Sequence, residues 1–175
     1  MRPRFCAQCA APVEWRRLDD ERHPQPVCPR CGHVEWQNPK PTVSALITRF
    51  QPGGRVEVLL VRRAVPPAKD AWDCPGGFID PDEHPEAALR REMREELGIT
   101  IVLRRFLGIF MDRYGDGDSA ASTLNIYYEA GIADGEPRPA SDVGAVAWFP
   151  LDQTPDELAF ENNRQAIEAL RACYV

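Results

Sequence analysis

The 175-residue chain lacks any long apolar run, and no stretch approaches the roughly 18 to 20 residues that a membrane-spanning helix needs. Its first ten residues, MRPRFCAQCA, lack the apolar core of a signal peptide. Positive charge is also scarce, since 21 lysines and arginines face 27 acidic residues and give a net charge of −6. This balance disfavours broad, non-specific binding to nucleic acid. We therefore expect a cytoplasmic protein with no membrane association and no specific nucleic-acid partner.

Four of the six cysteines form two C-x-x-C pairs, and 18 residues separate the pairs. Two tight turns that each deliver two thiolates match the tetrahedral coordination of zinc. Two disulfides are the alternative, but a reducing compartment disfavours them. The spacing predicts a structural zinc ribbon of short strands over residues 1–40, with Cys6, Cys9, Cys28 and Cys31 as ligands. The remaining cysteines, Cys74 and Cys173, are expected to be small buried residues.

The pattern changes after the proline-containing stretch QNPKP at 37–41, which we take as a domain boundary. Residues 41–175 form the second predicted domain. β-rich segments at 42–50, 56–64, 101–114, 124–133 and 145–149 predict strands separated by turns, and residues 66–77 predict a loop. A helix is expected from Pro85 to just before Gly98, and a closing helix over 157–172 with Phe160, Ile167 and Leu170 as candidates for its apolar face. The fold class is therefore α/β.

The first of these helices carries three carboxylates within five residues. Glu92 and Glu96 lie one turn apart on the same face, and Glu95 lies about 60° from Glu92. Such carboxylates repel one another unless a cation lies among them, and oxygen-rich clusters suit magnesium or manganese. The alternative is a solvated acidic face balanced by the three arginines of the same helix.

A longer sequence pattern that includes these glutamates favours the metal-binding interpretation. The pattern Gly77-x5-Glu83-x7-Arg91-Glu92-Met93-x-Glu95-Glu96-x-Gly98-Ile99 matches every fixed position of the Nudix box, Gx5Ex7REUxEExGU with U apolar. The chain therefore resembles the Nudix hydrolase superfamily. The four-cysteine ribbon is similar to that of a subgroup which includes NADH pyrophosphatases and FAD/ADP-ribose pyrophosphatases. The resemblance implies a Nudix α/β/α sandwich behind an N-terminal zinc ribbon, and a homodimer.

The resemblance also implies roles for individual residues. Glu92, Glu95 and Glu96, with the backbone carbonyl of Gly77, would bind catalytic Mg²⁺ or Mn²⁺. Arg91 would orient Glu92, and Glu83 would fix the loop or support the metals indirectly. A further carboxylate, acting as metal ligand or base, is expected six residues before a late tryptophan, and Asp142 occupies that place before Trp148. Otherwise Asp142 is a turn residue.

The implied reaction is metal-dependent hydrolysis of the pyrophosphate bond in a nucleoside diphosphate linked to another moiety. ADP-ribose and FAD are favoured over NADH, because NADH pyrophosphatases carry Ser-Gln-Pro-Trp-Pro-Phe-Pro after the box, where this chain has LRRFLGIFMDRYGDGDS. The alternatives are a dinucleoside polyphosphate or nucleoside triphosphate pyrophosphohydrolase, and a nucleotide-sensing zinc-ribbon regulator. Arg62, Arg63 and Tyr114 are the candidate substrate-binding residues.

Overall fold

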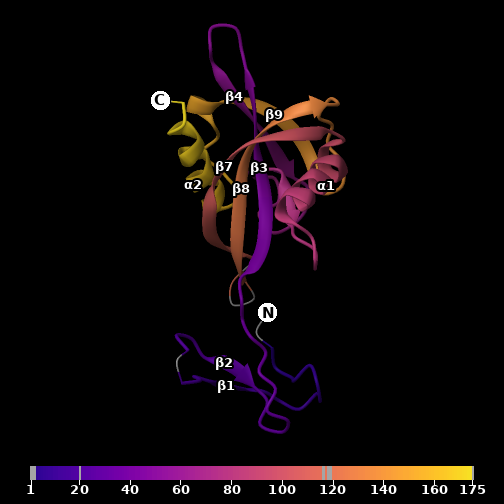
Figure 1. Cartoon of the computed structure of the whole chain (residues 1–175), viewed down its shortest axis with the longest axis vertical. Helices are drawn as coiled ribbons and strands as arrows, with labels where there is room; N and C mark the ends of the chain where they lie inside the picture. Colours follow the sequence, from indigo (N-terminus) through magenta and orange to yellow (C-terminus); the bar gives the residue numbers. More distant parts are fainter. Residues whose placement is uncertain (1–2, 20, 116, 118–119, 175) are drawn as a thin grey trace.

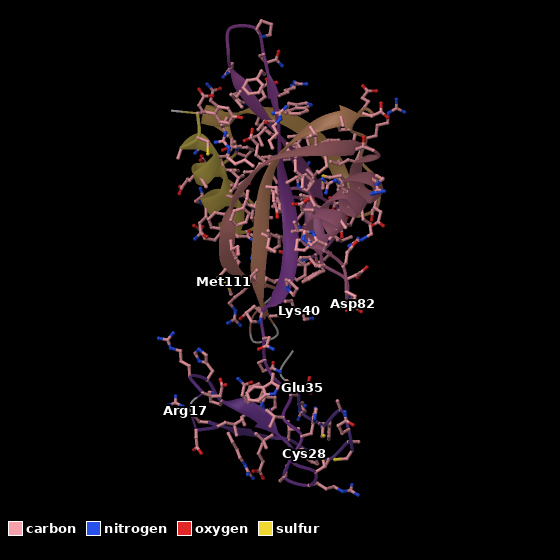
Figure 2. All side chains as sticks on the ribbon, viewed as in Figure 1. Arg17, Cys28, Glu35, Lys40, Asp82 and Met111 are labelled. Atoms are coloured by element: carbon pink, nitrogen blue, oxygen red, sulfur yellow. The ribbon has the colours of Figure 1, made fainter. Side chains whose placement is uncertain are left out.

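The computed structural model describes residues 3–19, 21–115, 117 and 120–174. An N-terminal ribbon contains two short antiparallel strands, β1 (Glu14–Arg16) and β2 (Gln25–Val27). Figure 1 shows this ribbon beyond one end of a larger α/β body, to which a single segment connects it. Figure 2 places Lys40 and Asp82 at the end of the larger body nearest to the ribbon.

The larger body is built on a seven-stranded mixed sheet. Its longest strands are β3 (Lys40–Phe50), β7 (Thr100–Tyr114) and β8 (Ala121–Asp134), joined by β4 (Val56–Arg63) and β9 (Val143–Pro150). The principal order is β5-β4-β3-β8-β7, with β6 paired to β3 and β9 paired to β4. β3 and β8 are parallel, and the remaining pairs are antiparallel.

Two helices cover the sheet and define two cores. Helix α1 (Pro85–Leu97) and helix α2 (Glu161–Arg171) lie on different sides of the sheet (Figure 1). Leu89, Met93 and Leu97 of α1 are fully buried in one core, and Ile167 and Leu170 of α2 in the other. These layers confirm the predicted α/β sandwich. No described helix is long and apolar enough to cross a membrane.

Local sequence explains why α1 begins and ends where it does. His84 caps its N-terminus by accepting a hydrogen bond from the Glu86 N–H, and Pro85 starts the first turn. Gly98 ends the helix in the left-handed conformation at φ 67°, and its N–H donates to the Arg94 carbonyl. The cap at His84 and the turn at Gly98 therefore fix where the acidic helix begins and ends over the sheet.

Three predictions about local structure are wrong. The region predicted as loop contains two short strands, β5 (Trp72–Asp73) and β6 (Gly76–Phe78). The closing helix starts at Glu161 rather than 157, because Leu158 forms a bridge with Trp72 and Phe160 is extended. Phe160 therefore lies outside the apolar face of α2. Cys173 is exposed, whereas Cys74 is buried as expected.

Candidate functional site

A cavity of about 440 Å³ opens where α1, the end of β7 and the start of α2 approach the middle of the sheet. Its volume lies within the range usual for small-molecule sites. Of the predicted site residues, Arg63, Gly77, Arg91, Glu92, Glu96, Tyr114 and Asp142 line it. Three others, Arg62, Glu83 and Glu95, lie outside its lining.

Two carboxylates of α1 lie at the cavity wall, where Glu96 is buried and Glu92 is half-buried. The Glu96 residue is 7% exposed, and its Oε2 accepts a hydrogen bond of 3.0 Å from the Gly76 N–H. Burial, followed by the charges of Asp142 and Glu92, raises the pKa of Glu96 to about 9. Burial also raises the pKa of Glu92, against the opposing effect of Arg91. A cation between these groups would relieve both the burial cost and the mutual repulsion.

Asp142 and Glu95 occupy different environments. Asp142 lies directly before β9, lines the cavity and is near enough to Glu92 and Glu96 to raise the pKa of both. The Glu95 side chain is 54% exposed and accepts a hydrogen bond of 3.2 Å from Arg91. The cavity thus brings together Glu92, Glu96 and Asp142, while Glu95 stays at the rim of the helix.

Arg91 connects the acidic residues of the loop and helix. Its guanidinium donates to both carboxylate oxygens of Glu83 at 3.0 and 2.8 Å, and to Glu92 Oε1 at 2.7 Å. It also donates to the Phe78 carbonyl at 3.2 Å. The paired hydrogen bonds to Glu83 hold the pKa of that carboxyl below its usual range. Arg91 is therefore placed to fix the Glu92 carboxylate relative to β6.

Two glycines let the sheet approach these carboxylates. A Cβ on Gly77 would lie 2.4 Å from Glu92 Oε1, so the carboxylate rests against the Gly77 backbone. A Cβ on Gly76 would lie 2.2 Å from the Val43 carbonyl oxygen, and Gly76 has φ 148°. A side chain at position 76 would therefore meet fixed backbone, whereas one at position 77 would displace the Glu92 carboxylate.

The candidate substrate-binding residues separate into two groups. Arg63 lies in the cavity wall, where it forms an ion pair of 2.9 Å with Asp73 and donates to the Tyr114 hydroxyl at 3.3 Å. Its guanidinium also lies over the rings of Tyr114 and Phe160. Arg62 points elsewhere: its Nε donates to the Asp70 carbonyl, and half of its side chain is exposed.

Sequence reasoning missed the polar residues that support this wall. Asn163 donates to Asp73 at 2.8 Å and accepts from the Tyr127 hydroxyl at 2.6 Å, and all three residues are buried. Asp112 of β7 accepts from the Asn162 N–H at 2.9 Å, and so supplies the capping contact that Phe160 does not make for α2. These residues are far apart in the chain, and no local motif marks them.

The ribbon holds a compact four-cysteine cluster. The sulfur atoms of Cys9 and Cys28 lie 3.5 Å apart, and Cys31 lies 3.6 Å from Cys6 and from Cys9. Tetrahedral ligands at about 2.3 Å from zinc would be roughly 3.8 Å from one another, whereas a disulfide needs about 2.05 Å. Among the described residues, this is the only group of three or more His, Cys, Asp or Glu side chains whose ligand atoms all lie within 4.8 Å of one another.

Comparisons with known proteins cover both parts of the chain. A model described as NUDIX domain matches residues 38–170, and one described as Nudix N-terminal, a zinc-ribbon model, matches residues 4–37. The chain is 27% identical over 154 residues to the NAD-capped RNA hydrolase NudC of Stutzerimonas stutzeri, covering 87% of this chain and 50% of the relative. It is 29% identical over 108 residues to the ADP-ribose pyrophosphatase of Methanocaldococcus jannaschii, covering 62% of each.

A solved NUDIX hydrolase from Nitrosomonas europaea has a similar fold, with a TM-score of 0.75 at 23% identity. The match covers 95% of this chain and 89% of that one. This chain spans about half the length of the NudC relative that it matches.

Proposed function

This chain belongs to the Nudix family, whose domain model matches residues 38–170, and we propose that it is a divalent-metal-dependent pyrophosphohydrolase. Its substrate would be a nucleoside diphosphate linked to another moiety. The family assignment confirms the resemblance that the Nudix box and the four-cysteine ribbon indicated. The acidic side chains in the wall of a cavity of small-molecule size support the activity.

The observation that carries this proposal is the position of the buried Glu96 and the half-buried Glu92 beside Asp142 in one cavity wall. Three acidic side chains in one cavity wall repel one another, and this repulsion contributes to the raised pKa of Glu96. An anionic ligand bound without a cation would add to the repulsion. Oxygen donors of this kind fit Mg²⁺ or Mn²⁺. A bound divalent ion would neutralise phosphate oxygens and acidify a water molecule.

The residues of the chain then have distinct tasks. Glu92 and Glu96 would hold the ion, with the Gly77 carbonyl and Glu95 as further candidate ligands. Arg91 orients the Glu92 carboxylate, and Glu83 in turn fixes Arg91 through its two hydrogen bonds. Asp142, which lines the cavity beside Glu92 and Glu96, is the candidate base that accepts a proton from the attacking water.

The relatives narrow the substrate class. One acts on NAD-capped RNA and another on ADP-ribose, according to their names. Both substrates contain an adenosine diphosphate group joined to a second moiety. We therefore favour ADP-ribose, FAD and NAD-type dinucleotides over nucleoside triphosphates, and the absence of the NADH-pyrophosphatase motif keeps ADP-ribose first.

A substrate panel in Mg²⁺ tests the proposal. We expect ADP-ribose to be hydrolysed to AMP and ribose 5-phosphate, with FAD and NADH cleaved more slowly. The panel should include a dinucleoside tetraphosphate, a nucleoside triphosphate and NAD-capped RNA, with products identified by mass spectrometry. Release of inorganic pyrophosphate as the preferred reaction would favour triphosphate hydrolysis instead. Tight nucleotide binding without turnover of any compound would favour the sensor alternative.

Zinc content tests the proposed ribbon. We expect one zinc per chain by elemental analysis, and loss of that zinc in Cys28→Ser. The described residues of the ribbon form two three-residue strands and bury few apolar side chains, so the ribbon should become protease-sensitive without its metal. Cys173→Ser, the same change at an exposed cysteine outside the cluster, is the matched control and should keep full zinc content. Unchanged zinc in Cys28→Ser would contradict four-thiolate coordination.

A further inference from the structure

The turn that carries Asp142 has an unusual backbone conformation. Ser141 has φ 58°, which lies in the left-handed region that residues with a side chain rarely adopt. Of the five described non-glycine residues with a positive φ, Ser141 is the one that lines the cavity. The Val143 N–H donates to the Ala140 carbonyl at 3.1 Å, so residues 140–143 form a hydrogen-bonded turn. Ser141 and Asp142 are the two central residues of this turn.

The sign of φ at Ser141 determines the direction in which the Asp142 side chain leaves the turn. A positive φ at the first central residue belongs to the mirror-image turn types, in which glycine is favoured at that place. With a negative φ, the same residues would form a common turn of the opposite hand, and the next side chain would point elsewhere. A residue in such an unfavourable conformation persists only where the surrounding structure fixes it.

Backbone hydrogen bonds fix this turn from two sides. The Ala140 N–H donates to the Glu96 carbonyl at 2.9 Å. That carbonyl belongs to the last turn of α1, where it has no partner within the helix. On the other side, the N–H of Ala64, directly after β4, donates to the Asp142 carbonyl at 2.8 Å. The turn is therefore held between the sheet and the helix that carries Glu96.

The position of the Asp142 carboxylate matters because of the charges beside it. Asp142 is half-buried, and its charge acts on both Glu92 and Glu96. Three carboxylates repel one another, so they would move apart if the backbone allowed it. The side chain of aspartate is short, and the position of its carboxylate therefore follows the backbone closely. The conformation of the preceding residue thus decides how close this third carboxylate lies to the other two.

We propose that Ser141 is a positioning residue, whose left-handed backbone holds the Asp142 carboxylate in the cavity beside Glu92 and Glu96. This inference rests on the proposed function, in which Asp142 accepts a proton from the attacking water. Glycine and asparagine adopt the left-handed conformation readily, whereas a β-branched side chain is strongly disfavoured in it. The backbone preference of the residue at position 141, and not its hydroxyl group, is therefore what activity depends on.

Substitutions that differ in backbone preference test this inference. For ADP-ribose in Mg²⁺, Ser141→Val should lower kcat by about 10-fold or more and keep KM within about 3-fold, because Asp142 acts in the chemical step. Ser141→Gly and Ser141→Asn should keep kcat within about 3-fold of wild type, and Ser141→Gly should not lower the thermal midpoint. Ser122→Val is the matched control, at an exposed serine of β8 that has no positive φ and lies outside the cavity lining. It should keep wild-type turnover.

A double variant separates positioning of Asp142 from general damage to the loop. Asp142→Asn should lower kcat by a similar factor, and adding Ser141→Val to it should change kcat by less than about 2-fold, because the group through which Ser141 acts is already absent. Calorimetry with Mn²⁺ gives a measurement that needs no turnover. Ser141→Val and Asp142→Asn should each weaken Mn²⁺ binding by about 3-fold or more, since each removes a negative charge from beside the ion, and Ser141→Gly should not.

Two results would overturn the inference. One is full kcat and Mn²⁺ affinity in Ser141→Val, and the other is a loss of kcat that persists undiminished when Asp142→Asn is already present. Equal losses in Ser141→Gly and Ser141→Val would also overturn it, because the side chain and not the backbone would then be responsible. If the wild type hydrolyses no diphosphate but the Mn²⁺ affinities follow the expected pattern, the proposed function is wrong and the positioning of Asp142 by Ser141 is supported.

Discussion

Glu96→Gln should abolish most turnover and, in metal-free protein, increase stability above neutral pH. We expect kcat to fall by a factor on the order of 10²–10³, because the amide cannot supply the negative charge that a divalent ion requires. The stability gain follows from the raised pKa of Glu96. In the unfolded chain this carboxyl ionises near its usual pKa of 4.5, whereas in the folded metal-free chain it keeps its proton up to about pH 9.

The sign of the pH dependence follows from this difference. Between these two pKa values the folded state holds one more proton than the unfolded state, so the free energy of unfolding decreases as pH rises. The slope for one proton is at most about 1.4 kcal/mol per pH unit. Glutamine does not titrate, and the variant should therefore lack this slope. Wild type and variant should be nearly equal in stability at about pH 5 and diverge in favour of the variant at about pH 8.

Urea denaturation in a chelator, at several pH values and with and without Mg²⁺, measures both effects. Mg²⁺ should stabilise the wild type and leave the variant almost unchanged, since only the folded wild type binds the ion. Glu86→Gln is the matched control, because Glu86 is on the same helix but is paired with Arg90 at the surface. Turnover of Glu96→Gln within a few-fold of wild type would refute the metal-site interpretation. A less stable variant at about pH 8 would contradict the burial argument.

The sequence was most informative where structure depends on neighbours along the chain. Pro85 and Gly98 mark the ends of α1, and the spacing of Leu89, Met93 and Leu97 identifies its buried face. Once that face is known, helix periodicity places Glu92 and Glu96 one turn apart beside it. These local rules place both carboxylates on one face of α1, and the packing of α1 against β6 and β3 brings that face to the cavity wall. The roles of the individual residues remain predictions.

The sequence was less informative where side-chain direction depends on strand pairing. Arg62 and Arg63 are adjacent on β4, and adjacent residues of a strand point to opposite faces. Only Arg63 lines the cavity, and pairing with β5 and β9, including an irregularity at this point, determines which of the two does so. Asn162 meets Asp112 across 50 positions of sequence, and only the packing of α2 against β7 brings them together. No local pattern encodes contacts of this kind.

Gly77→Ala should reduce activity by roughly 10²-fold with little loss of stability, because the added methyl group would displace the Glu92 carboxylate. The new Cβ would lie 2.4 Å from Oε1 and 2.6 Å from Cδ of Glu92. Gly77 does not have a positive φ, so the backbone itself tolerates alanine and the effect is purely steric. The Glu92 carboxylate would move from its present position, where it accepts a hydrogen bond of 2.7 Å from Arg91. The displaced carboxylate should bind the ion more weakly.

The decisive measurement for Gly77→Ala is the Mg²⁺ concentration that gives half-maximal activity, which should increase at least about 10-fold. Gly144→Ala is the matched control: it is also a strand glycine without a positive φ, but its nearest contact would be an ordinary 3.6 Å. That variant should keep wild-type activity and the same Mg²⁺ dependence. If Gly77→Ala loses activity with an unchanged Mg²⁺ requirement, the methyl group obstructs the substrate instead, and Glu92 would then not need its present position to bind the metal. If the Mg²⁺ requirement increases and Mn²⁺ partly restores the activity, the close approach of β6 and α1 is needed for metal binding.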